Sequence, residues 1–245
     1  MKAQPSEPMF SYFPAPAPRQ RPVLTLWSVS YVLIGLLVGG VVGFKVFQPI
    51  RVLPRIQLAP TFTLTDQTGA SLTSGSLRGQ LALYTFAYTR CGAACEAQWQ
   101  TLREIHTRLP EAQLGEVPFN FIIVSIDAEH DRPAVLSQFA ASLGAEAKTW
   151  RFVSASDANR LKTLVGEGFG VYYSPHSSGA FDFDPVFVLV DGLGVIRGEY
   201  RYQTEAPNAS RILRHLSMLA EEVRNSHGLT KYVYEAAHYF LCYAP

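Results

Sequence analysis

The sequence predicts an α/β fold, a mixed sheet flanked by helices, preceded by one transmembrane helix. One observation is a long run without charged residues near the start of the chain, at residues 23–44. Another is that short apolar runs, typical of buried strands, alternate further on with segments whose apolar residues recur at helical spacing. The last two apolar runs lie close enough together to form a hairpin. This order predicts a central sheet with parallel and antiparallel neighbours, covered by helices on both faces.

Length and composition narrow the class of protein. The chain has 245 residues, which accounts for one short membrane segment and one globular domain. Its net charge of +1 predicts no surface for nucleic acid. The 3 cysteines, Cys91, Cys95 and Cys242, are too few for a disulfide-stapled scaffold. The close pair instead indicates redox chemistry or metal binding.

The N-terminal part is predicted to anchor the domain. Residues 1–22 are rich in proline, alanine and serine, so we expect an extended or disordered tail. Residues 23–44 are long enough to cross about 30 Å of hydrocarbon as a helix. The run is too long for a cleaved signal peptide, and no small-x-small site follows it, so the anchor is expected to remain. Lysine and arginine are balanced on its two sides, and charge therefore predicts no orientation.

The globular domain is expected at residues 61–228, after a proline-containing linker at residues 45–60. Its strands are expected at residues 61–65, 81–88, 119–126, 150–153, 186–191 and 195–200. Helices are expected around residues 99–109, 135–143, 157–165 and 212–223. Asp131 is predicted to cap the second of these helices, with Pro133 in its first turn. A thioredoxin-like domain has this order of elements.

The central motif is the pair Cys91 and Cys95, placed between a buried strand and a helix. A thiolate at a helix start has a lowered pKa, because unpaired backbone N–H groups favour negative charge there, and Arg90 adds a positive neighbour. Spacing of four residues is expected to put both sulfurs on one helix face. They could then form a disulfide or hold one soft ion such as Cu(I). The alternative is a pair of buried cysteines acting as small apolar residues.

Several motifs together resemble the Sco/SenC family, over most of residues 60–225. The markers are Phe62-Thr63-Leu64-Thr65-Asp66-Gln67-Thr68-Gly69, Phe86-Ala87-Tyr88-Thr89-Arg90-Cys91 and Val124-Ser125-Ile126-Asp127-Ala128-Glu129-His130-Asp131-Arg132-Pro133. The resemblance implies a thioredoxin-like fold anchored in a bacterial inner membrane or its mitochondrial equivalent, with the domain expected on the periplasmic or equivalent side. It also implies copper delivery or thiol reduction at the dinuclear copper centre of cytochrome c oxidase. The family's copper ligands are the two motif cysteines and one distant histidine.

The chain departs from the family pattern at the third ligand. The family's histidine follows an aspartate before a late strand, and the matching pair here is Asp182-Phe183. Prolines that commonly follow the motif cysteines are replaced by Gly92 and Glu96. His176, in a turn-rich loop of the same region, is the nearest substitute ligand. The alternative for His176 is a solvated loop histidine.

The remaining histidines and acids are not expected to bind metal. His130 is expected at the surface, and His106 and His215 at the surface or in packing. Asp127, Glu129 and Asp131 lack the glycine and the distal glutamate of a calcium loop.

The C-terminal tail, residues 229–245, is unusually aromatic. Tyr232, Ala236, Tyr239 and Tyr243 are expected to share one helix face, which could dock on a partner or a membrane surface. The alternative is that the tail packs on its own domain. Cys242 is expected to be a buried thiol.

Two functions follow from these observations. The first is a copper chaperone or thiol–disulfide protein that uses Cys91 and Cys95 and serves cytochrome c oxidase or another membrane respiratory complex. The second is a non-catalytic accessory subunit of such a complex, with a degenerate copper site. A peroxidase is a weaker match, because only the run from Tyr88 to Cys91 approaches a peroxidatic motif.

Overall fold

The computed structural model describes residues 26–47, 51–146, 148–204, 207–226, 228 and 230–240. The chain divides into two units, Met1–Phe47 and Gln48–Pro245. In the first unit, helix α1 spans Leu26–Phe47, and its large apolar side chains from Trp27 to Val42 are exposed. No helix within the described residues is long and apolar enough to cross a membrane. The predicted tail at residues 1–22, the start of the predicted anchor at residues 23–25, and His227 and Cys242 lie outside the described residues.

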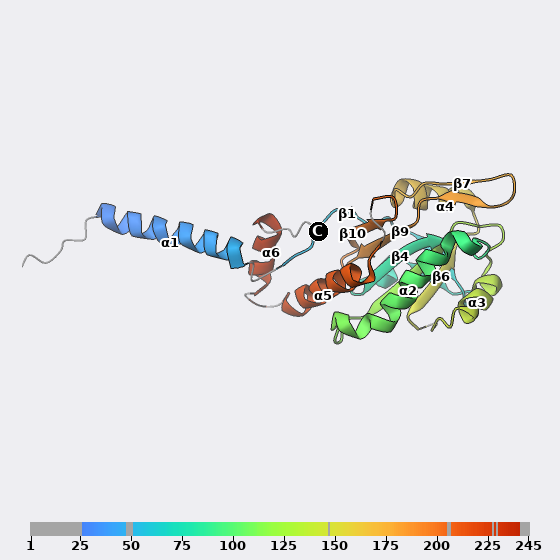
Figure 1. Ribbon diagram of the computed structural model, residues 1–245, viewed down its shortest axis with the longest axis horizontal. Coiled ribbons are helices and arrows are strands. Elements are labelled where there is room, and N and C mark those ends of the chain that lie inside the picture. The colour runs from blue at the N-terminus through green and yellow to red at the C-terminus, as the bar shows by residue number, and fades with distance from the viewer. Residues whose placement is uncertain are drawn as a thin grey trace, which may run out of the picture. The chain divides into compact units, whose positions relative to one another are not determined.

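The second unit contains the predicted mixed sheet flanked by helices (Figure 1). The sheet has 8 strands in the order β1-β10-β9-β4-β5-β6-β2-β3. Pairing is parallel for β4, β5 and β6 and antiparallel for the other neighbours. The strands are β1 Gln57–Leu58, β2 Thr63–Asp66, β3 Ser71–Thr73, β4 Leu81–Ala87, β5 Phe119–Ser125, β6 Trp150–Ser154, β9 Val186–Val190 and β10 Val195–Arg201. A separate two-stranded sheet is formed by β7 Tyr173–Pro175 and β8 Phe181–Phe183.

The helices of this unit fall where apolar residues recur at helical spacing. They are α2 Glu96–Arg108, α3 Pro133–Ser142, α4 Ala158–Lys162, α5 Ala209–Asn225 and α6 Thr230–Phe240. A π-helical turn, η4 Thr163–Gly168, continues α4. Helices α2 and α5 contact each other and cover one face of the sheet (Figure 1). Asp157 caps α4, since its side chain accepts hydrogen bonds from the backbone N–H groups of Asn159 and Arg160.

The centre of the sheet is buried on both faces, which explains its uninterrupted apolar runs. Every residue of β4, β5 and β9 is buried. Strands β9 and β10 form the predicted hairpin, and β2 and β3 form another at the sheet edge. Asp66 accepts bonds from the N–H groups of Thr68 and Ala70 in the β2–β3 turn, and Asp191 does the same for Leu193 and Val195 in the β9–β10 turn.

Helix α6 packs on its own unit through one face. Tyr234 and Ala237 are buried there in a cluster with Val52, and the Tyr234 hydroxyl accepts a hydrogen bond from Asn225. Tyr232, from the aromatic face expected to dock on a partner, is 72% exposed. The buried and the exposed side chains therefore lie on different faces of the same helix.

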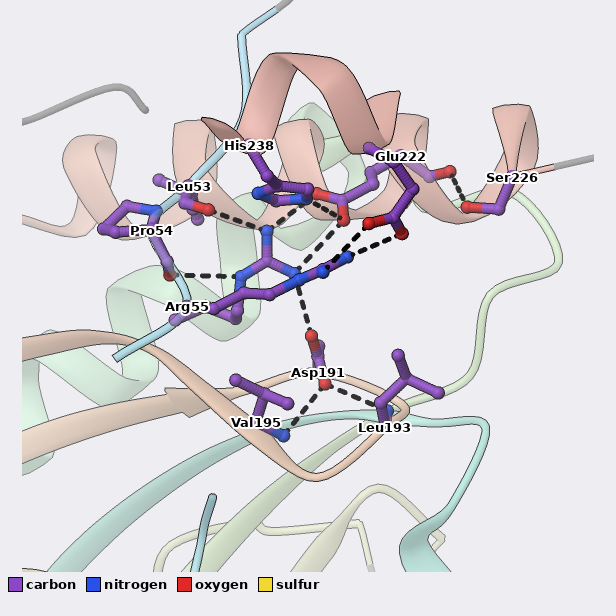
Figure 2. Close-up of polar contacts among 11 residues, drawn as sticks. Leu53, Pro54, Arg55, Asp191, Leu193, Val195, Glu222, Ser226 and His238 are labelled. Carbon is purple, nitrogen blue, oxygen red and sulfur yellow. Dashed lines mark hydrogen bonds and ion pairs between the residues drawn. The ribbon is translucent and has the colours of Figure 1, made fainter. Parts of the chain in front are cut away.

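A buried ion-pair network around Arg197 joins four segments of the chain. Figure 2 labels its members Leu53, Pro54, Asp191, Glu222 and His238. The Arg197 side chain is only 2% exposed, and its guanidinium pairs with Asp191 and with Glu222 at 2.8 Å each. It also donates to the backbone carbonyls of Leu53 at 2.8 Å and Pro54 at 3.2 Å. Glu222 contacts His238 of α6 at 2.9 Å. The predicted linker is thus bonded directly to Arg197 of β10, and the predicted tail is joined to Arg197 through Glu222.

The protonation of Glu222 follows from this network. Burial alone would raise its pKa, but hydrogen bonds from His238 and Arg197 and their positive charge outweigh burial, and the pKa is lowered. The carboxylate therefore stays ionised although it is buried.

Replacing Arg197 by methionine is expected to lower the free energy of unfolding by about 3–5 kcal/mol at pH 7, because Asp191 and Glu222 lose their partner while buried. The measurement is urea unfolding of the full chain in mild detergent. The control is Arg55→Met, which removes an exposed pair with Glu235 and should cost at most about 1 kcal/mol.

The difference in unfolding free energy between wild type and Arg197→Met is also expected to depend on pH. Because the folded-state pKa of Glu222 is lowered, its stabilising contribution is present above its unfolded pKa, near ~4.3, and is lost as the pH falls through the folded pKa. The difference between wild type and Arg197→Met should therefore shrink below about pH 4. Equal losses in the Arg55 and Arg197 variants would show that the network is not stabilising.

Candidate functional site

The two motif cysteines follow the end of the central strand β4 and form a disulfide. They lie at the two ends of a 3-10 turn, with η2 at Gly92–Cys95, and α2 begins only at Glu96 with Cys95 as its N-cap. The expectation that both sulfurs share one α-helix face is therefore wrong, because the chain is wound more tightly before the helix starts. Cys91 is 7% exposed and Cys95 is fully buried.

Gly92 explains part of this local backbone. Its φ is +51°, which an L residue with a side chain rarely adopts. Proline, the residue expected here from the family pattern, has φ fixed near −65° and cannot adopt this conformation. The turn between the two cysteines therefore depends on a glycine.

Asp131 holds the segment before Cys91 and does not cap a helix. Its fully buried carboxylate accepts hydrogen bonds from the Thr89 N–H at 2.9 Å, the Thr89 hydroxyl at 2.6 Å and the Ser125 hydroxyl at 2.5 Å. Helix α3 has Arg132 as N-cap and no side-chain cap bond. The predicted cap is therefore wrong. A buried carboxylate needs hydrogen-bond donors, and those that Asp131 finds lie at the ends of β4 and β5 and not in the first turn of α3.

A second carboxylate of the same loop holds Arg90. Asp127 Oδ2 lies 2.6 Å from Arg90 Nη2, and Asp127 Oδ1 lies 2.9 Å from His130 Nδ1. Burial would raise the pKa of Asp127, but hydrogen bonds from Arg90 and His130 outweigh it and the pKa is lowered. The hydrogen bond to Asp127 likewise raises the pKa of Arg90. The charge of Arg90 is thus paired with Asp127 while the disulfide is closed, and His130, half-exposed at the surface, takes part in the pair.

The β7–β8 hairpin is bonded to the cysteine motif from the other side. The Phe181 N–H donates to the Tyr88 hydroxyl at 3.2 Å, and Arg90 Nη2 donates to the Gly179 carbonyl at 3.4 Å. The Tyr88 ring also meets Phe181 and Phe183 edge-on, with centroids 5.1 and 6.1 Å apart. Phe183, which stands where the family pattern has a histidine, is therefore an aromatic packing residue here.

His176 lies in the turn of this hairpin, and its side chain is exposed. Its backbone N–H donates to Ala180 and its carbonyl accepts from Gly179, so the turn is closed by backbone bonds. Within the described residues, no group of three or more histidine, cysteine, aspartate or glutamate side chains is arranged to hold a metal ion. The role of His176 as a third ligand stays a prediction.

His106 and His215 are packing residues. His106 meets the rings of Phe121 and Trp150 edge-on. His215 is buried, and its Nδ1 lies 2.6 Å from the Tyr200 hydroxyl. Burial first, and then the nearby arginines Arg211 and Arg214, lower the pKa of His215 to about 4, so the ring is neutral at physiological pH.

Comparison with known proteins identifies relatives of this arrangement. The SCO1/SenC family model matches residues 52–219. The SCO1 protein homolog of Bacillus subtilis is 22% identical over 147 residues, which cover 60% of this chain and 75% of that protein.

Two solved structures show the same fold. One is BsSco, a member of the Sco family of cytochrome c oxidase assembly proteins, in which a disulfide switch has been identified. Its sequence is 20% identical to this chain, and the two structures match with a TM-score of 0.60 over 69% of this chain and 97% of BsSco. Yeast Sco1 with copper bound is 19% identical with a TM-score of 0.53, covering 72% and 98%.

Replacing Asp131 by alanine is expected to lower the free energy of unfolding by about 3 kcal/mol, because buried N–H and hydroxyl donors lose their acceptor. The measurement is urea unfolding of the full chain. Asp157→Ala, which removes a true and exposed helix cap, is the matched control and should cost about 1 kcal/mol. Similar losses in the two variants would mean that Asp131 contributes no more than a cap.

Proposed function

The chain belongs to the SCO1/SenC family, and on that basis we propose that it is a membrane-anchored Sco-like protein that serves a respiratory oxidase. Cys91 and Cys95 would hold Cu(I) as cargo, or would cycle between dithiol and disulfide. The observation that carries the proposal is the disulfide between these two cysteines at the end of β4, beside a hairpin that carries a histidine.

Thiol exchange at this pair would begin at Cys91. The sulfur of Cys95 is fully buried, whereas Cys91 keeps some exposure. A partner thiolate would form a bond to the Cys91 sulfur while the Cys91–Cys95 bond breaks, and Cys95 would leave as a thiolate. A second partner thiol then releases Cys91, so two electrons and two protons reach the pair. The partner is oxidised to its own disulfide.

Copper binding would follow reduction, because sulfurs joined in a disulfide are not available as thiolates. Two thiolates suit Cu(I), which is soft and accepts few ligands. Cu(II) also needs nitrogen donors, and the Phe183 ring supplies none. His176 is the candidate for that donor, since its turn is already bonded to Arg90 through Gly179.

The anchor and the location are part of the proposal. The uncharged run at residues 23–44 would hold the protein in a bacterial inner membrane, and α1 is helical over most of that run. A disulfide is typical of oxidising compartments, which supports a domain on the periplasmic side. The partner would be cytochrome c oxidase or another membrane respiratory complex, as for the relative BsSco.

One observation favours a second function, that of a non-catalytic accessory subunit with a degenerate copper site. Phe183 packs against Tyr88 in the place where a copper-binding histidine is expected. In that case the domain would serve as a docking module in a respiratory complex, and the disulfide would be structural.

Copper titration of the reduced full chain separates these functions. We expect wild type to bind Cu(I) and to bind Cu(II) poorly, because the proposed ligands are two thiolates without a nitrogen donor. Cys91→Ser should lose Cu(I) binding, and Phe183→His should gain Cu(II) binding. If His176→Ala removes residual Cu(II) binding, the hairpin histidine is a ligand. If wild type binds neither ion and the reduced cysteines resist alkylation, only the accessory function survives.

The orientation is tested with paired reporters fused after Pro245. A reporter that is active only in the periplasm should be active, and one that is active only in the cytoplasm should be silent, because thiol and copper exchange with an oxidase occur outside the cytoplasm. The opposite pattern would overturn the proposed location without affecting the copper assay.

A further inference from the structure

The β7–β8 hairpin has an unusual attachment. Among the residues that the structure describes, its two strands pair only with each other, so no ladder hydrogen bonds join it to the main sheet. Its base is held where Arg201 pairs with Asp184 at 2.9 Å and donates to the Gly170 carbonyl. The position of its tip therefore depends on contacts with the cysteine motif.

Arg90 provides the link at the tip. Its Nη2 lies 3.4 Å from the Gly179 carbonyl, and a Cβ atom at Gly179 would lie 3.7 Å from its Nη1, so guanidinium and turn are in contact. The same nitrogen lies 2.6 Å from Asp127. The Asp127 side chain is 3% exposed and also accepts a hydrogen bond from the His130 N–H, whereas the Arg90 side chain is 45% exposed. Arg90 thus connects a fixed carboxylate on one side of the motif to a loosely attached turn on the other.

This link lies next to the reactive group, because Arg90 directly precedes Cys91. The turn it holds contains His176, and the strand that follows contains Phe183. We propose that Arg90 is a positioning residue of the Cys91–Cys95 site. By joining Asp127 to the Gly179 carbonyl it fixes the hairpin tip beside the disulfide, and so limits how easily a thiol partner reaches Cys91. This inference rests on the proposed function in that it assigns the hairpin a part in access to the cysteine pair.

An arginine is needed for this link rather than any cation. Both bonds leave the same terminal nitrogen of Arg90, Nη2. The ammonium of a lysine has enough N–H donors, but its side chain ends one bond short of that position and cannot reach both acceptors. Arg90→Lys should therefore behave like Arg90→Ala. If only the positive charge near the cysteines mattered, Arg90→Lys would behave like wild type.

The test is the rate at which dithiothreitol reduces the disulfide in the full chain, in mild detergent at fixed pH. Arg90→Ala and Arg90→Lys are each expected to react roughly fivefold faster than wild type, as the loss of one partly exposed ionic link would allow. Hydrogen exchange at residues 176–181 should accelerate in the same variants while exchange in β4 stays unchanged. The control is Arg103→Ala, which removes an equally exposed arginine, paired with Glu96, without touching the hairpin; its rate should match wild type.

Three outcomes would overturn the inference. They are a slower reduction in Arg90→Ala, a wild-type rate in Arg90→Lys, and unchanged exchange at the hairpin tip. If Arg90→Ala does not fold, Arg90→Lys and Asp127→Asn, which loosens the same link, decide the question through the same two rates. Neither rate involves copper or an oxidase, so a failure of the proposed function would appear in the copper titration and not here.

Discussion

The parallel pairing of β4 with β5 is the constraint on which the site depends. The two strands are in register to their last residues, where Ala87 lies opposite Ser125. Both are buried on both faces, so the pairing cannot shift without moving the core. The loops that leave the two strands therefore start side by side, which brings Thr89 and Arg90 to Asp131 and Asp127. The cysteine motif is held by carboxylates because two buried strands end at the same level.

The antiparallel neighbour of β4 places a second polar centre at the opposite end of the sheet. Strand β9 pairs with β4 so that Val190 lies opposite Ala82, near the start of β4. Asp191 follows directly and pairs with Arg197, and Gly192 comes so close that a Cβ there would lie 3.1 Å from the backbone of Gly79. The cysteine pair thus lies at one end of the sheet. At the other end, the Arg197 network binds the segment at Leu53 and Pro54 and, through Glu222, helix α6. The Arg197 network is therefore kept apart from the cysteine pair, which has its own carboxylates, Asp127 and Asp131.

The sequence predicted what depends on local patterns and missed what depends on partners far along the chain. The long central strands, the β9–β10 hairpin and the cysteine pair were predicted from the sequence because apolar spacing and turn residues are local signals. The function of Asp131 could not be predicted from the sequence, since its partner Thr89 is 42 residues away. The nearby Pro133 also marks a helix start, and this local signal suggested a cap instead. The buried face of α6 was missed for a similar reason. Its aromatic residues suggested one face, whereas its burial is decided by Val52 and Glu222, which a pattern within the tail does not contain.

The departures from the family pattern act differently on sulfur chemistry and on copper chemistry. A disulfide needs only two sulfurs within reach, and the positive φ of Gly92 still closes the turn between them. Copper in its oxidised state needs a nitrogen donor, and at position 183 that donor has been exchanged for a ring that packs on Tyr88. The same ring helps to hold the hairpin over the motif, so the exchange removes a ligand and adds packing. The hairpin lies outside the main sheet, so its position depends on side-chain contacts such as those with Tyr88 and not on ladder hydrogen bonds. Thiol exchange therefore requires only Cys91 and Cys95, whereas a complete copper site also requires a nitrogen donor. His176 lies in the hairpin turn, so the attachment of the hairpin tip decides whether this histidine can reach the two sulfurs.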